Sequence, residues 1–548
     1  MSVLTQKRNR HVVPRWRSSL AAASSRDLNP LQTAKKVPSL GQAQAQLQES
    51  FKEFKEDRSI GTAADLFGVA LLSGNLKESA EAAQYILQHA AEAPSMLVEM
   101  ATGALSGKSL PFLQSEYADS RTAIARLRTL LRTNPRSATL WADLARHQAS
   151  VGATAKALKS MRVSVSLAPN HRWILRAANR LLLHAGEYDQ AHDLIARHPR
   201  TREDPWLMAA EIASAQLLHT TPRFLKQGRD ILRVRRLPIV HISELATAVA
   251  TSDLANGAHK SARRLLRMAI KDPTENALAQ IEWAEREHGD GVALDPAVRR
   301  MPDAFEATCW VRLYEGRLPA AMKAGREWLA DEPFADAPLA VMSHIAGLLD
   351  DYDTLLTATK EGLDRNPTSL LHLNNRAFAV MSTGTIENEM ELANIAQFLV
   401  DRMAAKEDDF VQATANAGLL MYRLGRYEDG RDLYRKAINH AEQHDGRRVH
   451  AFAALYHLRE AALARAPWLP ETLDTARRQV IRLGDGAVQF FMRKLEDLAA
   501  RPDHADEILG PATAARYLAK YSEQAAQLRV QHTETGPILI VPSRLLSK

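Results

Sequence analysis

Cysteine is nearly absent from this chain of 548 residues, because Cys309 is the only one. A single cysteine excludes an intrachain disulfide and is typical of a protein from a reducing compartment. No apolar run approaches the roughly 18 residues that a membrane-spanning helix needs. The basic N-terminus is not followed by the apolar core of a secretory signal. The sequence therefore predicts a cytoplasmic protein with no membrane association, in which Cys309 is small, buried and reduced.

Aromatic residues are also few, at 6% of the chain, and runs that alternate Val, Ile and Thr with polar residues between turn signals are absent. Such runs mark strands, so their absence excludes a sheet-rich fold. Alanine is abundant, which suits helices that approach one another closely. The apolar content of 46% and the charged content of 25% are those of a folded, soluble protein. We expect an all-α fold.

Catalytic and metal-binding motifs are missing as well. The sequence contains no H-E-x-x-H, G-x-S-x-G, paired-cysteine or dinucleotide-binding pattern. The string Gly103–Ser109 is one residue short of a phosphate-binding loop, and no strand precedes it. We therefore predict that the protein is not an enzyme and that it has no cofactor and no metal site.

The net charge of +7 is concentrated at the N-terminus. Residues 1–36 hold eight Lys and Arg residues and one acid, so the rest of the chain is neutral overall. This balance argues against a nucleic-acid-binding body. Residues 1–40 are predicted to form a disordered basic tail. Within the tail, Trp16 between Arg15 and Arg17 is predicted to dock on a partner; alternatively, Trp16 covers the first helices of its own chain.

The remaining sequence is organised as repeated helical pairs that often end at a proline. Pro333 and Pro367 lie 34 residues apart, and Pro135 and Pro169 show the same interval. A period of this size indicates stacked helix–turn–helix units, each of which buries its apolar face against its neighbours. We expect the pairs to begin near residue 60, after an amphipathic helix over residues 42–58.

Small and bulky residues recur at fixed places within these pairs. The three clearest sets are Trp141, Leu144, Ala145, Ala157, Met161, Ser164 and Pro169; Leu339, Met342, Ser343, Tyr352 and Pro367; and Ala417, Gly418, Gly425, Tyr427, Gly430, Tyr434 and Ala437. This pattern resembles the tetratricopeptide repeat (TPR) family. The resemblance implies a right-handed α-solenoid over residues 41–465, which we expect to be followed by a helical cap over 466–530 and a tail over 531–548. The short β-like run at 536–541 either folds back onto the cap or adds to a partner.

The resemblance also implies a concave groove lined by the first helix of each pair. Three successive pairs place Trp310, His344 and Phe378 at the family's groove position, 34 residues apart. Neighbouring groove positions hold Tyr314, Asn374 and Tyr422. Flat amphipathic side chains in a row suit an extended peptide or a partner helix. The alternative is that these residues are ordinary core between helices.

Residues 223–271 are strongly basic, with eleven cations and three acids. The predicted stripe consists of Arg229, Arg233 and Arg236 on one helix, and Arg263, Arg267 and Lys271 on another. Such a stripe suits phosphates or an acidic protein surface. A solvated outer face is the alternative.

These observations favour a non-catalytic scaffold that binds a protein or peptide partner in its groove, as an accessory subunit of a bacterial multi-protein assembly. The first alternative is a nucleic-acid-linked adaptor that uses the tail and the basic stripe. A weaker alternative is a regulator that senses a peptide. The sequence leaves the partner's identity and the oligomeric state open.

Overall fold

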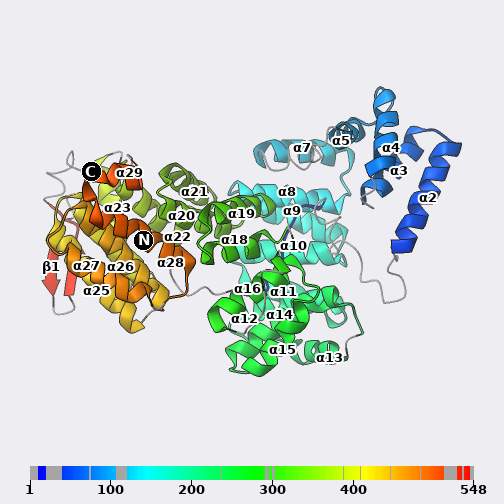
Figure 1. Ribbon diagram of the computed structural model, residues 1–548. Coiled ribbons are helices and arrows are strands. Elements are labelled where there is room, and N and C mark those ends of the chain that lie inside the picture. The colour runs from blue at the N-terminus through cyan, green and yellow to red at the C-terminus, as the bar shows by residue number, and fades with distance from the viewer. Residues whose placement is uncertain are drawn as a thin grey trace. The chain divides into compact units, whose positions relative to one another are not determined.

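The protein is described here by a computed structural model (Figure 1). The described residues are 10–19, 40–72, 76–105, 120–234, 236–289, 294, 297–298, 301, 303–386, 388–407, 409–444, 446–481, 483–510, 527–533 and 536–542. They belong to two compact units. One unit consists of residues 12–258 and 330–334, and the other of residues 1–11, 259–329 and 335–548.

The unit that holds residues 12–258 is built from helices that follow one another as helix–turn–helix pairs. Its elements are α2 (Leu40–Glu56), α3 (Ile60–Leu72), α4 (Leu76–Gln88), α5 (Ser95–Leu105), α7 (Ser120–Thr133), α8 (Ala138–Ser150), α9 (Thr154–Leu167), α10 (Arg172–His184), α11 (Tyr188–Ala196), the 3-10 helix η2 (Pro199–Arg202), α12 (Pro205–Leu217), α13 (Leu225–Val234) and α14 (Ile239–Ala255). The expected amphipathic helix over 42–58 is α2, which buries Leu47 and Phe54.

The other unit continues the helix pairs and ends in a small sheet. Its helices are α15 (His259–Ala269), α16 (Glu275–His288), α18 (Phe305–Tyr314), α19 (Leu318–Asp331, whose last two residues belong to the first unit), α20 (Asp336–Leu349), α21 (Tyr352–Arg365), α22 (Leu370–Thr383), α23 (Glu389–Ala405), α24 (Phe410–Arg423), α25 (Tyr427–His444), α26 (Arg447–Leu463), α27 (Leu469–Val480), α28 (Gly486–Ala500), the 3-10 helix η3 (Pro502–His504) and α29 (Ala505–Leu509). Strands β1 (Arg529–Thr533) and β2 (Gly536–Ile540) pair antiparallel.

Helices α8 and α9 show why these sequences form pairs. The Ser137 side chain caps α8 by accepting a hydrogen bond from the Leu140 backbone N–H, which satisfies one of the free donors at the helix start. Leu144 on α8 and Met161 on α9 are buried, as the spacing predicts. Ser164 donates a hydrogen bond to the Ala138 carbonyl oxygen at 2.7 Å, which joins the end of α9 to the start of α8.

Glycines lie where helices α24 and α25 pack most closely against each other. A Cβ atom on Gly418 would lie 2.8 Å from the Tyr434 ring, and one on Gly430 would lie 2.6 Å from the Tyr422 ring. The turn between the two helices contains Gly425 with φ of +75°, a conformation in which glycine meets no steric penalty. The small residues of the repeat pattern therefore set the distance between the paired helices, and the TPR-like α-solenoid architecture is confirmed.

Several details differ from the expectations. Helices α26 and α27 pack against each other, so the expected boundary at residue 465 falls inside a helix pair. Residues 536–540 of the β-like run form β2, which pairs with β1 and also contacts α23 and α25. The first two residues of β1, Arg529 and Val530, belong to the range expected for the cap. Residues 10–19 of the expected disordered tail are placed, and residues 12–18 are largely buried. The remainder of the tail, residues 1–9 and 20–39, lies outside the described residues. Cys309 is buried, as expected.

Candidate functional site

The three residues at the expected groove position lie on the first helices of consecutive pairs. Trp310 is on α18, His344 is on α20 and Phe378 is on α22. All three side chains are buried, and they belong to or contact one apolar core within their unit. The 34-residue spacing therefore aligned equivalent positions correctly, but these positions are covered.

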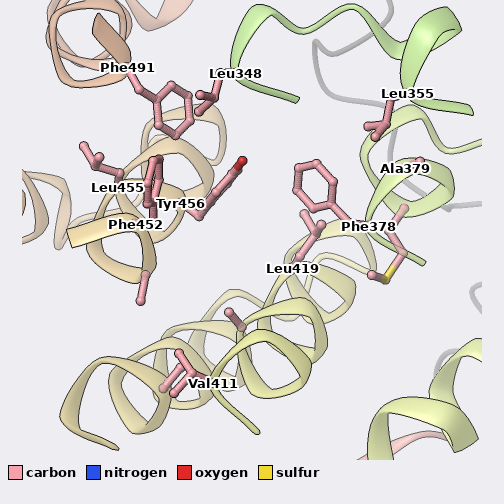
Figure 2. Close-up of a cluster of buried hydrophobic side chains, with 14 of the residues drawn as sticks. Leu348, Leu355, Phe378, Ala379, Val411, Leu419, Phe452, Leu455, Tyr456 and Phe491 are labelled. Carbon is pink, nitrogen blue, oxygen red and sulfur yellow. The ribbon is translucent and has the colours of Figure 1, made fainter. Parts of the chain in front are cut away.

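Residues of α26 in the same chain cover His344 and Phe378 of this row. Phe452 meets His344 edge to face, with ring centroids 5.2 Å apart, and Tyr456 meets Phe378 in the same way at 5.3 Å. The Arg448 guanidinium lies 5.1 Å from the centre of the Tyr314 ring. Figure 2 shows Phe452 and Tyr456 with Phe491 of α28 in this apolar cluster.

The spacing on α26 explains this match. Arg448, Phe452 and Tyr456 are four residues apart, so they share one helix face. Each of them meets a residue from a different helix pair. The four-residue spacing of Arg448, Phe452 and Tyr456 could be seen in the sequence. It does not predict which helices this face of α26 contacts, because those helices lie far away along the chain.

The prediction of an open groove is therefore wrong for this row. Asn374 and Tyr422 are buried too: Asn374 accepts a hydrogen bond from Asn416, and Tyr422 accepts one from the Trp468 indole. Tyr314 is only partly buried, and it lies beneath Arg448. The alternative interpretation, in which these side chains form core between helices, is the one that their burial supports.

A cluster of charged side chains lies at the C-terminal end of α20, next to this core. Asp350 follows α20 in the left-handed region, with φ of +56°. Its carboxylate forms an ion pair with Lys494 of α28, lies 3.6 Å from the Arg459 guanidinium of α26, and accepts a hydrogen bond from the Tyr352 hydroxyl at 2.9 Å. Arg459 and Asp350 are both buried, so the attraction between their opposite charges offsets part of the free-energy cost of removing each charge from water.

The N-terminal segment at residues 12–19 occupies a second site, in the other unit. It has no regular secondary structure from Val12 to Ser18. The Trp16 ring is fully buried among residues of α8, α9 and α10, and it packs on Phe334 with ring centroids 5.0 Å apart. We call the residues around this segment the segment seat; they include Asp143, Asp331, Glu332 and Phe334.

Carboxylates of the segment seat bind the arginines on either side of Trp16. Arg15 pairs with Glu332, and the Arg17 Nε donates to Asp331 at 2.9 Å. The side chains of both arginines are buried, as are those of their acidic partners. The backbone N–H of Ser19 donates to Asp143 at 2.9 Å. Arg15, Trp16 and Arg17 thus contact their own chain and not a partner. The alternative for Trp16 placed it on its own chain, but on the first helices and not on α8, α9 and α10.

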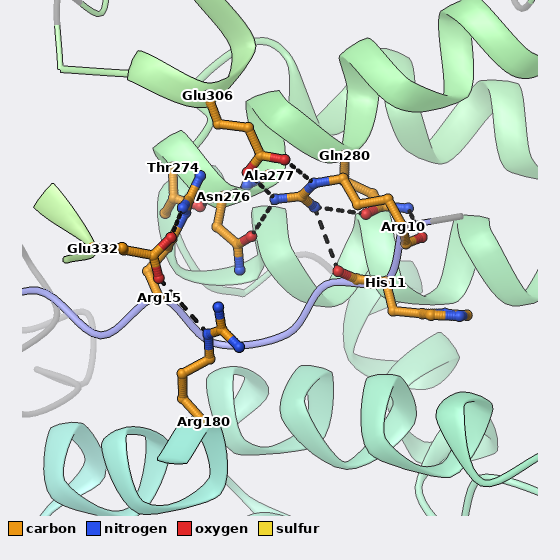
Figure 3. A network of polar contacts seen from close by, with 10 residues as sticks. All are labelled: Arg10, His11, Arg15, Arg180, Thr274, Asn276, Ala277, Gln280, Glu306 and Glu332. Carbon is orange, nitrogen blue, oxygen red and sulfur yellow. Dashed lines mark hydrogen bonds and ion pairs between the residues drawn. The ribbon is translucent and has the colours of Figure 1, made fainter. Parts of the chain in front are cut away.

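Arg10 forms its side-chain contacts within the unit to which it belongs, the one that contains residues 1–11. Its guanidinium binds both carboxylate oxygens of Glu306 at 2.9 Å and also donates to Gln280 and Asn276 (Figure 3). Gln280 in turn donates to the Arg10 carbonyl oxygen at 2.9 Å. The paired contacts of a planar guanidinium with a carboxylate are among the stronger charge-assisted interactions in proteins.

The basic stripe is only partly helical. Arg229 and Arg233 lie on α13, but Arg236 comes after the end of that helix. Arg263 and Arg267 lie on α15, and Lys271 comes after its end. All six side chains are exposed, and Arg229 pairs with Asp253 at 2.6 Å. The predicted continuous helix face is wrong at Arg236 and Lys271.

Neither site contains a metal-binding cluster of described residues. Among the described residues, no cluster of three or more Cys, His, Asp and Glu side chains is placed to hold a metal ion. Within the same residues, every helix is too short or too polar to cross a bilayer. The segment seat can supply an aromatic pocket and carboxylates, which together suit the binding of a peptide.

Comparison with known proteins adds little to this description. No protein-family model and no curated protein matches the chain. Among solved structures, the crystal structure of yeast Tom70 matches over 85% of this chain and 98% of its own, with 12% identity and a TM-score of 0.29. The Cut9–Hcn1 hetero-tetramer of the APC/C matches over 83% and 93%, with 10% identity and a TM-score of 0.36. Naa15/Naa10 bound to HypK-THB matches over 89% and 78%, with 12% identity and a TM-score of 0.21. Likeness at this level does not bear on function.

Proposed function

We propose that this protein is a non-catalytic interaction scaffold that holds a partner protein through an extended segment of that partner. On this proposal it serves as an accessory subunit of a bacterial multi-protein assembly. Its mechanism is pre-organisation: stacked helices lose little conformational entropy when they bind, so few contacts are needed for useful affinity.

One observation carries the proposal, namely the segment seat with residues 12–19 in it. Trp16 fills an apolar pocket, and buried ion pairs flank it on both sides. A buried aromatic anchor with charge-assisted hydrogen bonds around it is typical of the residues that dominate binding energies. The helices therefore hold a peptide with the pattern Arg-Trp-Arg in cis, and we infer that a partner segment of similar chemistry is held in trans.

A peptide added in trans tests this function. The probe is a fluorescent peptide with the sequence of residues 10–19, added to the full chain and to an Arg15→Ala/Trp16→Ala/Arg17→Ala variant. In the variant the internal segment no longer fills the seat, so the peptide binds with saturation. In the unmodified chain the tethered segment competes at an effective concentration of about millimolar, so the apparent affinity is at least about tenfold weaker.

The control peptide has alanine in place of the residue equivalent to Trp16, and it is expected to lose binding to the variant. Circular dichroism of the variant checks that its helices are intact. Equal binding of both peptides, or no binding by a folded variant, would show that the segment seat has only a structural role. The scaffold proposal would then lose the observation on which it rests.

The nucleic-acid alternative is weakened by the same contacts. Arg10, Arg15 and Arg17 pair with carboxylates of the chain, so these tail cations are not available to phosphates. The exposed Arg263 and Arg267 remain as candidate phosphate contacts. Binding of RNA or DNA that falls steeply with salt, and that is lost on Arg263→Gln/Arg267→Gln substitution, would restore this alternative.

A further inference from the structure

A cavity of about 840 Å³ lies between α23, α25 and the C-terminal hairpin, entirely within one unit. Its volume falls in the range of roughly 300–1,000 Å³ that is typical of small-ligand sites. Neither the segment seat nor the core around α26 uses this cavity. Of its lining residues, only those in the run at 536–541 were noted in the sequence, and not as part of a ligand site.

One part of the cavity wall is apolar. Met403 from α23, Phe410 from α24 and Leu539 from β2 line it, and all three are almost fully buried. The Phe410 ring is held in place by the His440 ring of α25, with centroids 4.4 Å apart. This part of the wall is therefore rigid and suits an aliphatic group.

Another part of the wall is positively charged. Lys406, Arg435 and Lys436 line the cavity, and Asp432 is the one carboxylate among its lining residues. Two of these charges already have partners, because Arg435 pairs with Glu471 and Asp432 lies 3.7 Å from His532. Lys436 is half-buried, and its ammonium group donates to the Pro537 carbonyl oxygen at 2.8 Å, a contact that leaves its charge unneutralised.

The two lysines repel each other. Burial, with the charge of Lys406 as the second cause, lowers the pKa of Lys436. Within the described residues, neither lysine forms an ion pair with a carboxylate. An anionic group between them would relieve this repulsion, and the partly desolvated surroundings would strengthen the attraction.

We propose that this cavity binds a small amphipathic anion, a carboxylate that carries an aliphatic tail. The carboxylate lies between Lys406 and Lys436, and the tail lies on Met403, Phe410 and Leu539. The site is independent of the segment seat, so the scaffold function and this ligand site stand or fall separately.

Calorimetric titration of the full chain with decanoate tests the proposal. We expect saturable binding with one molecule per chain at concentrations below about 1 mM. Acetate has the charge without the tail, and decanol has the tail without the charge, so both are expected to bind at least about tenfold more weakly. Absence of saturable decanoate binding, or equal binding of decanol, overturns the proposal.

Two variants locate the binding. Lys406→Gln/Lys436→Gln keeps an amide donor near Pro537 and is expected to weaken decanoate binding at least about tenfold. Ala404→Trp, at an exposed position that lines the cavity, places a bulky side chain at its wall and is expected to weaken binding. The matched control is Lys323→Gln on α19, an exposed lysine away from the cavity lining, which is expected to have no effect.

A peptide arm distinguishes the source of the carboxylate. The probe is an acetylated tetrapeptide that ends in two leucines and a free carboxylate. Tighter binding of this peptide than of decanoate, with the same loss in the lysine variant, would assign the cavity to a protein C-terminus and overturn the small-molecule proposal. Decanoate binding that is unchanged in all variants would place that binding elsewhere and overturn it as well.

Discussion

Phe452 of α26 stands edge-on to His344 of α20, with ring centroids 5.2 Å apart and ring planes at 80°. This contact joins two helices from different pairs of the same unit. Burial, together with the nearby Arg448, lowers the pKa of His344 well below its usual value, so the ring is neutral at pH 7. His344 therefore behaves as a flat apolar side chain, and its contact with Phe452 is one of those that join α20 to α26.

Phe452→Ala is expected to loosen these contacts. The side chain is fully buried, and removal of a buried phenylalanine costs about 3–5 kcal/mol through lost transfer energy and an unfilled cavity. Hydrogen exchange is the suitable measurement, because repeat arrays open locally and do not always unfold in one step. We expect faster exchange in both α20 and α26.

The matched control is Phe490→Ala on α28, where the same residue type is only partly buried. Phe490→Ala is expected to lower stability by less than half as much as Phe452→Ala, and to leave hydrogen exchange in α20 unchanged. Equal effects of the two substitutions would contradict the role of α26 as the element that covers the row of groove residues.

His344 makes the fold sensitive to acid. Because the pKa of His344 is lower in the folded state than the ordinary histidine value of 6.5, the unfolded chain binds more protons as the pH falls below about 6.5. The stability that the neutral ring contributes is complete above that pH and is lost below it, by on the order of 1 kcal/mol per pH unit. His457, whose pKa burial lowers to about 3, contributes in the same direction.

His344→Phe is expected to remove part of this sensitivity. Among the residues that the structure describes, neither ring nitrogen of His344 has a hydrogen-bond partner, so phenylalanine loses no polar contact there and avoids protonation. Thermal unfolding between pH 4.5 and 7.5 should show a smaller drop in Tm on acidification than in the unmodified chain. The exposed His504→Gln is the control, and it should follow the unmodified chain.

The sequence predicted what is local in this fold and missed what depends on distant residues. The pairing of α8 with α9, and the glycines between α24 and α25, follow from short-range spacing. The residues that cover His344 and Phe378 lie on α26. Asp331, which binds Arg17, and Phe334, on which Trp16 packs, lie more than 300 residues away from them along the chain. These contacts depend on how the stacked pairs curve, because a small rotation per repeat accumulates along the array.

The candidate sites show the same division. The expected groove residues lie at equivalent positions of successive pairs, and Arg15, Trp16 and Arg17, predicted to dock on a partner, contact the chain itself. Their targets were not identified, because neither pattern contains information on what lies opposite. The cavity lined by Lys406 and Lys436 was missed altogether, since it is assembled from three helices and the hairpin.

Asp350→Asn is expected to destabilise the unit through the charges that it leaves behind. Asparagine matches the shape of aspartate and tolerates the left-handed backbone at this position. The change removes one of the buried carboxylates near Arg459 and the ion-pair partner of Lys494. Loss of one member of a buried ion pair typically costs about 3–5 kcal/mol.

Thermal unfolding of three variants checks this prediction. Asp350→Asn combined with Lys494→Met should recover part of the loss, because Lys494, the cation left without its ion-pair partner, is then absent. Asp497→Asn removes a carboxylate from a solvent-exposed pair with Arg501 and should leave the unfolding temperature nearly unchanged. A double variant less stable than Asp350→Asn alone would contradict the electrostatic explanation.

Glycine to alanine substitutions should have opposite effects at two helical positions. Alanine favours a helix interior by about 1 kcal/mol over glycine. At Gly68 in α3, no atom outside its own helix lies within 4 Å of the added Cβ, so Gly68→Ala is expected to stabilise the protein. At Gly430 in α25, the Cβ would lie 2.6 Å from the Tyr422 ring and 3.0 Å from the Gly418 carbonyl oxygen, so steric overlap outweighs the helix preference.

Denaturant unfolding monitored by hydrogen exchange, read separately in α3 and in α24 with α25, measures both effects. Gly430→Ala should cost about 1–3 kcal/mol in its own helix pair and leave α3 unchanged. If Gly430→Ala stabilised its pair as Gly68→Ala stabilises α3, close packing between α24 and α25 would not be the reason for glycine there. The repeat pattern would then reflect turn and helix preferences alone, and not the distance between helices.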